Sequence, residues 1–90
     1  MTYTVLWSPE AGRELQAILS SAPDSGAVTQ AFQAVNHLLR NDPDQVGESR
    51  PKGRRVAFLS PLGIQFEVHW RQQTVLILHA WRFQSPGRRP

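Results

Sequence analysis

Four residues near the carboxyl end of the chain have side chains that suit chemistry on a phosphodiester. Glu67, His69, His79 and Arg82 interrupt the otherwise apolar stretch PLGIQFEVHWRQQTVLILHAWRF, residues 61 to 83. Metal-free cleavage of RNA needs a base near the 2′-hydroxyl, a cation at the phosphate and an acid for the leaving 5′-oxygen. Histidine is the side chain best suited to move a proton near neutral pH, and arginine supplies positive charge and forked hydrogen bonds. The residue types therefore match this reaction if the fold brings them together.

The stretch reads as two strands joined at Gln72-Gln73, and the pairing of these strands decides which side chains share a face. A two-residue turn at this position would place Phe66 opposite His79, and residues directly opposite each other lie on the same face of a sheet. Because Phe66 belongs to the apolar face, His79 is predicted to be a packed core residue. Glu67, His69 and Arg82 are predicted to lie together on the other, open face.

An arginine from the preceding strand is expected to join this group. If Pro61-Leu62-Gly63 is a three-residue loop with Gly63 at positive φ, Arg55 lies opposite His69, whereas a two-residue loop places Arg54 there. The alternative is that these polar side chains form only surface ion pairs, which contribute little. The residues that we predict to be catalytic are Arg82, His69, Glu67 and Arg55.

The charges are distributed unevenly along the chain. Residues 1 to 48 carry two arginines and six acidic residues, whereas residues 49 to 90 carry eight basic residues and one acidic residue. Seven of these eight cations are arginines, whose guanidinium group suits phosphate oxygens. The second half of the chain is therefore predicted to bind a polyanion. The residues predicted to contact RNA are Arg50, Lys52, Arg54 and Arg71.

The elements that must position these residues are predicted in the order β-α-α-β-β-β. Residues 3 to 7 favour a short strand, and Ser8-Pro9 is a typical helix start. A second helix is expected from Asp24 or Ser25 to Asn41, followed by an exposed loop and three strands at about 54–60, 64–71 and 74–82.

This order indicates an α+β fold, with a small, mostly antiparallel four-stranded sheet and two helices packed on one of its faces. The first strand is expected beside the last strand. The predicted core consists of Trp7, Leu15, Ile18, Phe32, Val35, Leu38, Phe66, Val68, Ile77 and Trp81.

Composition excludes several classes of protein. The chain has 90 residues, 40% of them hydrophobic, and no cysteine, so disulfide frameworks and thiolate chemistry are excluded. The three histidines lack a paired metal-ligand spacing, so we predict neither a metal site nor a cofactor. No apolar run is long enough for a membrane span, which favours a cytoplasmic protein without a membrane partner. We expect one domain over residues 1–85 and a disordered tail at 86–90.

The opening TVLWSPEAGREL, the hairpin RRVAFLSPLGIQFEV and the closing VLILHAWRF resemble the RelE/ParE superfamily of toxins from type II toxin-antitoxin systems. The resemblance covers residues 3 to 83, and Arg82 matches an arginine that ends the last strand in this family. It implies a RelE-like fold and a cognate antitoxin protein as partner. In the RelE branch it also implies metal-independent cleavage of messenger RNA on the ribosome, and hence inhibition of translation. Two alternatives stay open: a ParE-like inhibitor of DNA gyrase without nuclease chemistry, and a non-toxic partner-binding member of the superfamily.

Overall fold

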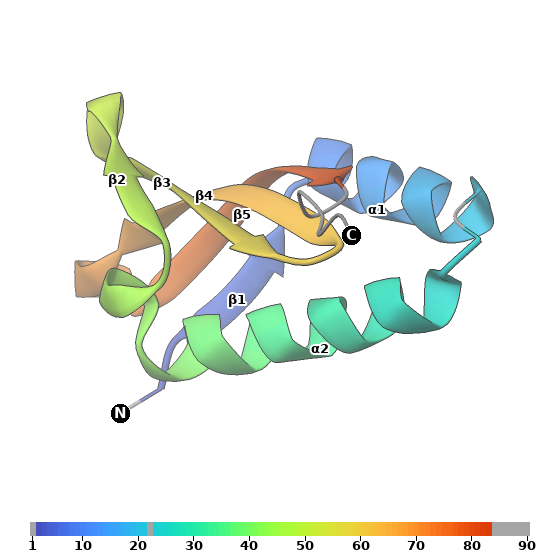
Figure 1. Cartoon of the computed structure of the whole chain (residues 1–90). Coiled ribbons are helices and arrows are strands. Elements are labelled where there is room, and N and C mark those ends of the chain that lie inside the picture. The colour runs from blue at the N-terminus through green and yellow to red at the C-terminus, as the bar shows by residue number, and fades with distance from the viewer. Residues whose placement is uncertain (1, 22, 84–90) are drawn as a thin grey trace.

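The computed structural model describes residues 2–21 and 23–83 and folds them into a five-stranded sheet with two helices (Figure 1). The helices are α1 (Pro9–Ser21) and α2 (Ser25–Asn41). The strands are β1 (Thr4–Trp7), β2 (Glu48–Arg50), β3 (Arg54–Leu59), β4 (Leu62–His69) and β5 (Thr74–Arg82). Short 3-10 turns occur at η1 (Pro43–Gln45), η2 (Pro51–Gly53) and η3 (Trp70–Gln72). The tail predicted to be disordered lies outside the described residues.

The strand order is β1-β5-β4-β3-β2, with β1 parallel to β5 and all other neighbours antiparallel. The α+β class, the two helices and the place of the first strand beside the last are confirmed. The predicted number of four strands is wrong, because the loop after α2 contains the additional edge strand β2, which pairs with the start of β3. Its three exposed residues show no apolar alternation, so the sequence pattern did not reveal it.

Helix α1 begins as predicted, and it covers the part of β5 that β1 leaves unpaired. The hydroxyl of Ser8 accepts a hydrogen bond from the backbone N–H of Ala11 at 3.0 Å, so Ser8 caps the helix. β1 pairs with β5 only as far as Ile77. Beyond that point the carboxylate of Glu14 accepts a hydrogen bond from the backbone N–H of Ala80 at 2.9 Å. A side chain of α1 thus provides the hydrogen-bond partner for a backbone N–H of β5 at a point where β5 has no neighbouring strand on that side.

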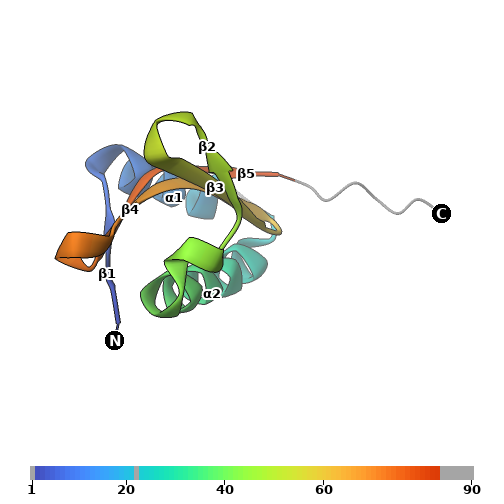
Figure 2. The ribbon, with the colours of Figure 1, turned by 90° about the vertical axis from the view of Figure 1, so that its left-hand side faces the viewer.

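Helix α2 packs its apolar stripe against the sheet from one side, as Figure 2 shows with α2 below the strands. The buried residues of this stripe are Val28, Ala31, Val35 and Leu39. Leu38, which was predicted to be a core residue, is 40% exposed, and Leu39 takes the buried position instead. The predicted core residues Leu15, Val35, Phe66 and Ile77 are buried, whereas Trp7, Ile18, Phe32 and Val68 are partly buried and pack against the core.

The pairing of β4 with β5 differs from the prediction in two ways. The turn spans four residues, so that His69 faces Thr74 and Phe66 faces Ile77. A bulge then follows, because Gln65 faces His79 and Leu78 is left without an opposite residue. The longer turn shifts the pairing of β5 against β4 by two residues. Because side chains alternate between the faces with a period of two, this shift alone leaves every side chain of β5 on its predicted face.

The bulge shifts the register by one further residue and exchanges the two faces of β5 beyond Leu78. His79 and Trp81 therefore lie on the side opposite α2, which we call the open face, together with Glu67 and His69. Ala80 and Arg82 lie on the helix side. The prediction of His79 as a core residue is wrong, since 46% of its side chain is exposed, and Trp81 was also placed on the wrong face.

Among the described residues, no helix is long and apolar enough to cross a membrane.

Candidate functional site

Three side chains from β3 and β4 meet on the open face and form what we call the Glu67 cluster, consisting of Arg54, Glu67 and His69. Arg54 lies directly opposite Glu67 in the sheet, and its Nε donates a hydrogen bond to Glu67 Oε2 at 3.3 Å. The other carboxylate oxygen, Oε1, lies 3.1 Å from His69 Nε2. Glu67 therefore holds a cation on one oxygen and an imidazole on the other, while 45% of the His69 side chain remains exposed.

The register of β3 explains why Arg54 rather than Arg55 joins the cluster. Leu59 pairs with Leu62, so the loop between β3 and β4 has two residues, and Arg54 occupies the open face. Arg55 points to the other side, where its guanidinium donates hydrogen bonds to the carbonyl oxygens of Val46 and Gly47 at 3.0 and 3.1 Å. The prediction that an arginine lies beside Glu67 and His69 is confirmed, but the predicted placement of Arg55 in this group is wrong, because Arg54 takes that position.

Further basic residues extend the Glu67 cluster at the same end of the sheet. Arg50 on β2 lies opposite Arg54 and forms an ion pair with Glu48 at 3.1 Å. Arg71 follows His69 by two residues and places its guanidinium 5.2 Å from the centre of the Trp70 ring. Lys52 lies between β2 and β3 and is exposed. We call this region the basic end; it contains the four residues predicted to contact RNA.

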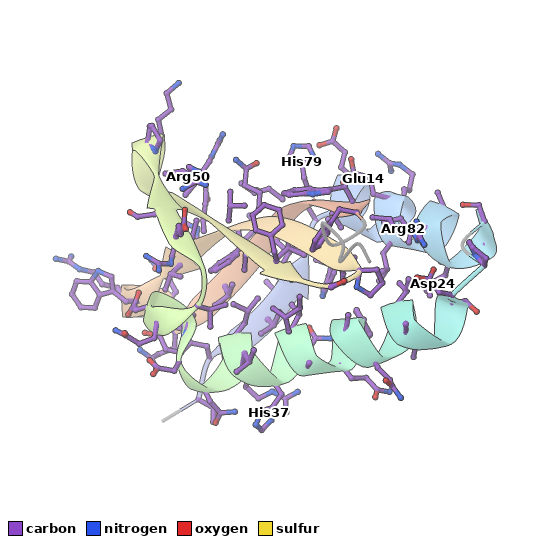
Figure 3. The ribbon with its side chains drawn as sticks, in the orientation of Figure 1. Glu14, Asp24, His37, Arg50, His79 and Arg82 are labelled. Atoms are coloured by element: carbon purple, nitrogen blue, oxygen red, sulfur yellow. The ribbon has the colours of Figure 1, made fainter. Side chains whose placement is uncertain are left out.

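Arg82 does not belong to this group. It lies on the helix side, where its guanidinium binds Asp24 at 3.0 Å, and 27% of its side chain is exposed. His69 pairs with Thr74, eight residues before Arg82 along β5. At the rise of an extended strand this separation is roughly 26 Å. Figure 3 shows Arg50 and Arg82 at opposite ends of the sheet, so the predicted grouping of Arg82 with His69 and Glu67 is wrong.

His79 forms a second histidine-carboxylate contact, away from the Glu67 cluster. Its Nδ1 lies 3.4 Å from Oε2 of Glu14, the carboxylate whose other oxygen accepts the Ala80 N–H (Figure 3). Glu14 thus links α1 to β5 through two contacts. Because the carboxylate is engaged in holding the strand edge, we interpret this pair as structural.

An aromatic group that the sequence analysis missed occupies the other end of the open face. Phe58 makes edge contacts with Trp81 and Phe83, with ring centres 5.9 and 5.3 Å apart. The indole of Trp81 lies directly against Gly63, where a Cβ atom would collide with the ring. Gly63 is therefore needed for this close approach and lies within β4, so the prediction of Gly63 in a loop at positive φ is wrong. The signal was present in the sequence, because a glycine inside a strand often marks a close approach.

Among residues 2–21 and 23–83, no group of three or more histidine, aspartate or glutamate side chains is arranged to hold a metal ion.

No protein-family model and no curated protein matches this chain significantly. Several solved structures share its fold. One is the RelBE2 toxin-antitoxin complex from Mycobacterium tuberculosis, with a TM-score of 0.75, 20% identity, and coverage of 91% of this chain and 92% of the other. The chain has the fold of the RelE/ParE superfamily. This confirms the predicted resemblance at the level of the fold.

Two further solved structures with this fold are a ParDE system and an isolated RelE toxin. The ParDE system of Pseudomonas aeruginosa gives a TM-score of 0.67 at 21% identity, covering 91% of this chain and 97% of the other. The isolated RelE toxin of Escherichia coli gives 0.66 at 11% identity, covering 93% of this chain and 87% of the other. At these identities the likeness establishes the fold alone.

Proposed function

We propose that this protein is the toxin of a toxin-antitoxin pair and that it cleaves messenger RNA on the ribosome at the Glu67 cluster. The observation that carries the proposal is the contact of 3.1 Å between His69 and a Glu67 carboxylate that also binds Arg54, on a sheet face that no helix of the described chain covers. This arrangement supplies a group for proton transfer and a cation for the phosphate. The fold shared with toxin-antitoxin structures supports the toxin part of the proposal, and the Glu67 cluster supports the cleavage part.

His69 would act as the base. When Nε2 carries the proton and donates a hydrogen bond to Glu67, Nδ1 has a free lone pair and can take the proton of a ribose 2′-hydroxyl. The 2′-oxygen then attacks the adjacent phosphorus, and the bond to the 5′-oxygen breaks. This step leaves a 2′,3′-cyclic phosphate, and the departing 5′-oxygen takes a proton from solvent.

Glu67 and the arginines would support this step without transferring the proton themselves. Glu67 fixes the tautomer and orientation of the ring and stabilises the imidazolium that forms. The Arg54 guanidinium has five N–H donors, and its contact with Glu67 uses the one at Nε. Arg54 and Arg50 would hold the phosphate oxygens, on which negative charge increases in the transition state.

The aromatic group at the other end of the open face favours a protein partner as well. Phe58 is 56% exposed although it is a large apolar side chain, and Trp81 and Phe83 extend the same surface. Exposed aromatic side chains are enriched where proteins bind each other. We propose that the antitoxin covers this group, because similar structures include complexes of RelE with RelB.

The same aromatic surface supports a second candidate function, in which the protein binds DNA gyrase and performs no chemistry. The similarity to the ParDE system is consistent with this reading. The two functions differ in what stops growth, because a nuclease blocks translation whereas a gyrase inhibitor causes DNA damage.

Induction of the chain alone in bacteria tests both functions. We expect translation arrest with new messenger RNA 5′ ends, and we expect His69→Ala to reduce cleavage by roughly 10²- to 10⁴-fold, the usual contribution of a general base. Glu67→Gln should give an intermediate loss, because the ring loses its carboxylate partner. His37→Ala is the matched control, since His37 is an exposed histidine on α2, away from the open face (Figure 3).

Full RNA cleavage in His69→Ala would overturn the nuclease proposal. DNA breaks without RNA cleavage would favour the gyrase reading instead. Normal growth with full-length soluble protein would leave the partner-binding module as the remaining function.

A further inference from the structure

We propose that Trp70 and Arg71 form a nucleotide-binding subsite that selects single-stranded RNA. In this subsite the indole of Trp70 stacks on an unpaired base, while Arg71 contacts a neighbouring phosphate. The inference rests on the proposed function, because it assigns the substrate class of the same site. It concerns residues on the turn between β4 and β5 that the cleavage step does not use.

Trp70 is unusual among the three tryptophans of the chain. Trp7 donates a hydrogen bond to Asn36 and packs against Phe32, and Trp81 lies against Gly63. Trp70, by contrast, is 62% exposed, more than any other large hydrophobic residue described as exposed. The guanidinium carbon of Arg71 lies 5.2 Å from the centre of the Trp70 ring. A ring of this size in water offers a flat apolar surface to a ligand.

The turn that carries Trp70 is held in place by several hydrogen bonds. Gln73 adopts the left-handed conformation with φ of 52°, and both its backbone N–H and its side-chain amide donate to the carbonyl oxygen of Trp70, at 3.2 and 2.8 Å. The carbonyl oxygen of Gln73 accepts from the backbone N–H of Thr4 at 2.8 Å, which ties the turn to β1. The backbone at Trp70 is therefore positioned before any ligand binds, which reduces the entropic cost of binding.

The position of the turn relative to the Glu67 cluster fits a continuous RNA strand. Trp70 directly follows His69 and lies three residues from Glu67, a separation of roughly 10 Å at most for an extended chain. Arg71 directly follows Trp70, while Arg54 lies opposite Glu67 on β3 and Arg50 lies opposite Arg54 on β2. A strand whose phosphates follow these arginines would place one of its bases at Trp70.

An aromatic platform beside a cationic track is a typical way to bind single-stranded nucleic acid, because every base has a stacking face. Paired bases inside a duplex are not available for such stacking, so the subsite should discriminate against double-stranded RNA. The geometry thus assigns selection for unpaired RNA to the turn, separate from the proton transfer at His69.

Binding to a fluorescein-labelled, 2′-O-methyl RNA oligonucleotide measures this subsite without cleavage, because the nucleophilic hydroxyl is blocked. We expect Trp70→Ala to weaken binding of the single strand roughly tenfold, within the usual contribution of stacking on one base. Trp70→Phe should restore most of the affinity. The affinity for a blunt RNA duplex should be the same in all three proteins.

Arg71→Ala should weaken binding and reduce the slope of log affinity against log salt by about 0.7, as expected for one lost phosphate contact to a single strand. Leu38→Ala and Arg13→Ala are the controls, because they remove an exposed apolar side chain and an exposed arginine on the two helices. Thermal melts of each variant confirm that it is folded.

Unchanged affinity of Trp70→Ala for the single strand would overturn the inference. An equal loss of affinity for single strand and duplex would also overturn it, and so would preferential binding of the wild-type protein to double-stranded DNA.

The outcome of the binding experiment is independent of the cleavage assay. If the wild-type chain binds single-stranded RNA through Trp70 but does not cleave RNA in cells, the subsite stands and the nuclease proposal fails. If His69→Ala abolishes cleavage while Trp70→Ala binds normally, the nuclease proposal stands and the subsite fails.

Discussion

At the scale of single residues, the role of Arg82 depends on which face of β5 its side chain occupies. On the open face an exposed strand-end arginine would be available for a phosphate. On the helix side Arg82 binds Asp24, the residue at the start of α2. Asp24 makes no capping hydrogen bond to α2 with its side chain, so its described partner is the arginine. The pair therefore connects the end of β5 to the junction between the helices.

We predict that Arg82→Ala lowers the free energy of unfolding by about 1 kcal/mol, the upper range for a partly exposed ion pair. Asp24→Ala should cost a similar amount. The double variant should lose less than the sum of the two, because each single variant already removes the shared interaction. Urea denaturation of the four proteins measures the coupling. Strict additivity would show that the two side chains do not stabilise each other.

At the scale of elements, the apolar stripe of each helix faces the core, but packing decides which residues at the margin of a stripe are buried. Leu38 and Leu39 are neighbours in α2, and both fit a spacing of three to four from earlier apolar residues. Leu39 is fully buried, whereas Leu38 is 40% exposed at the margin of the stripe. The direction in which α2 crosses the sheet decides between them.

We predict that Leu39→Ala lowers the free energy of unfolding by about 2–5 kcal/mol, because it leaves a cavity in the core. Leu38→Ala should cost less than about 1 kcal/mol. The two variants form a matched pair, since the change in helix propensity is the same at adjacent positions of one helix. Equal losses in chemical denaturation would show that the assignment of the buried face is incorrect.

At the scale of the whole molecule, the β4–β5 hairpin separates two polar sites. The Glu67 cluster and the basic end lie beside the turn between β4 and β5, and the Arg82–Asp24 pair lies at the far end of β5 on the opposite face. The separation of roughly 26 Å along the strand is far beyond direct contact. The two sites share no described side chain and are expected to act independently.

We therefore predict that the stability changes of His69→Ala and Arg82→Ala add within about 0.5 kcal/mol, as is usual for sites more than ~10 Å apart. Arg82→Ala should also retain RNA cleavage within a few-fold of the wild-type rate, measured at a temperature where both proteins are folded. Loss of cleavage in a folded Arg82→Ala protein would mean that the arginine acts with His69 after all.

The sequence by itself determined the two helices and the order of every strand except β2, the start of α1 at Ser8, and the shared face of Glu67 and His69. These features depend on local chemistry, namely capping, the helical repeat and the two-residue repeat of a strand, and each is encoded within a few neighbouring residues. The presence of an arginine beside Glu67 also followed from the sequence, because either loop length between β3 and β4 places one there.

Only the tertiary structure decided which face carries His79, Trp81 and Arg82. A single unpaired residue, Leu78, exchanges the faces for the rest of β5, and no local pattern marks it, because the apolar run continues through the bulge. The bulge lies just past the end of β1, where α1 replaces a strand as the neighbour of β5. The contacts that accompany the change come from Glu14 and Asp24, more than 50 residues away in the chain. Long-range packing of this kind is not visible in the spacing of residues along one strand.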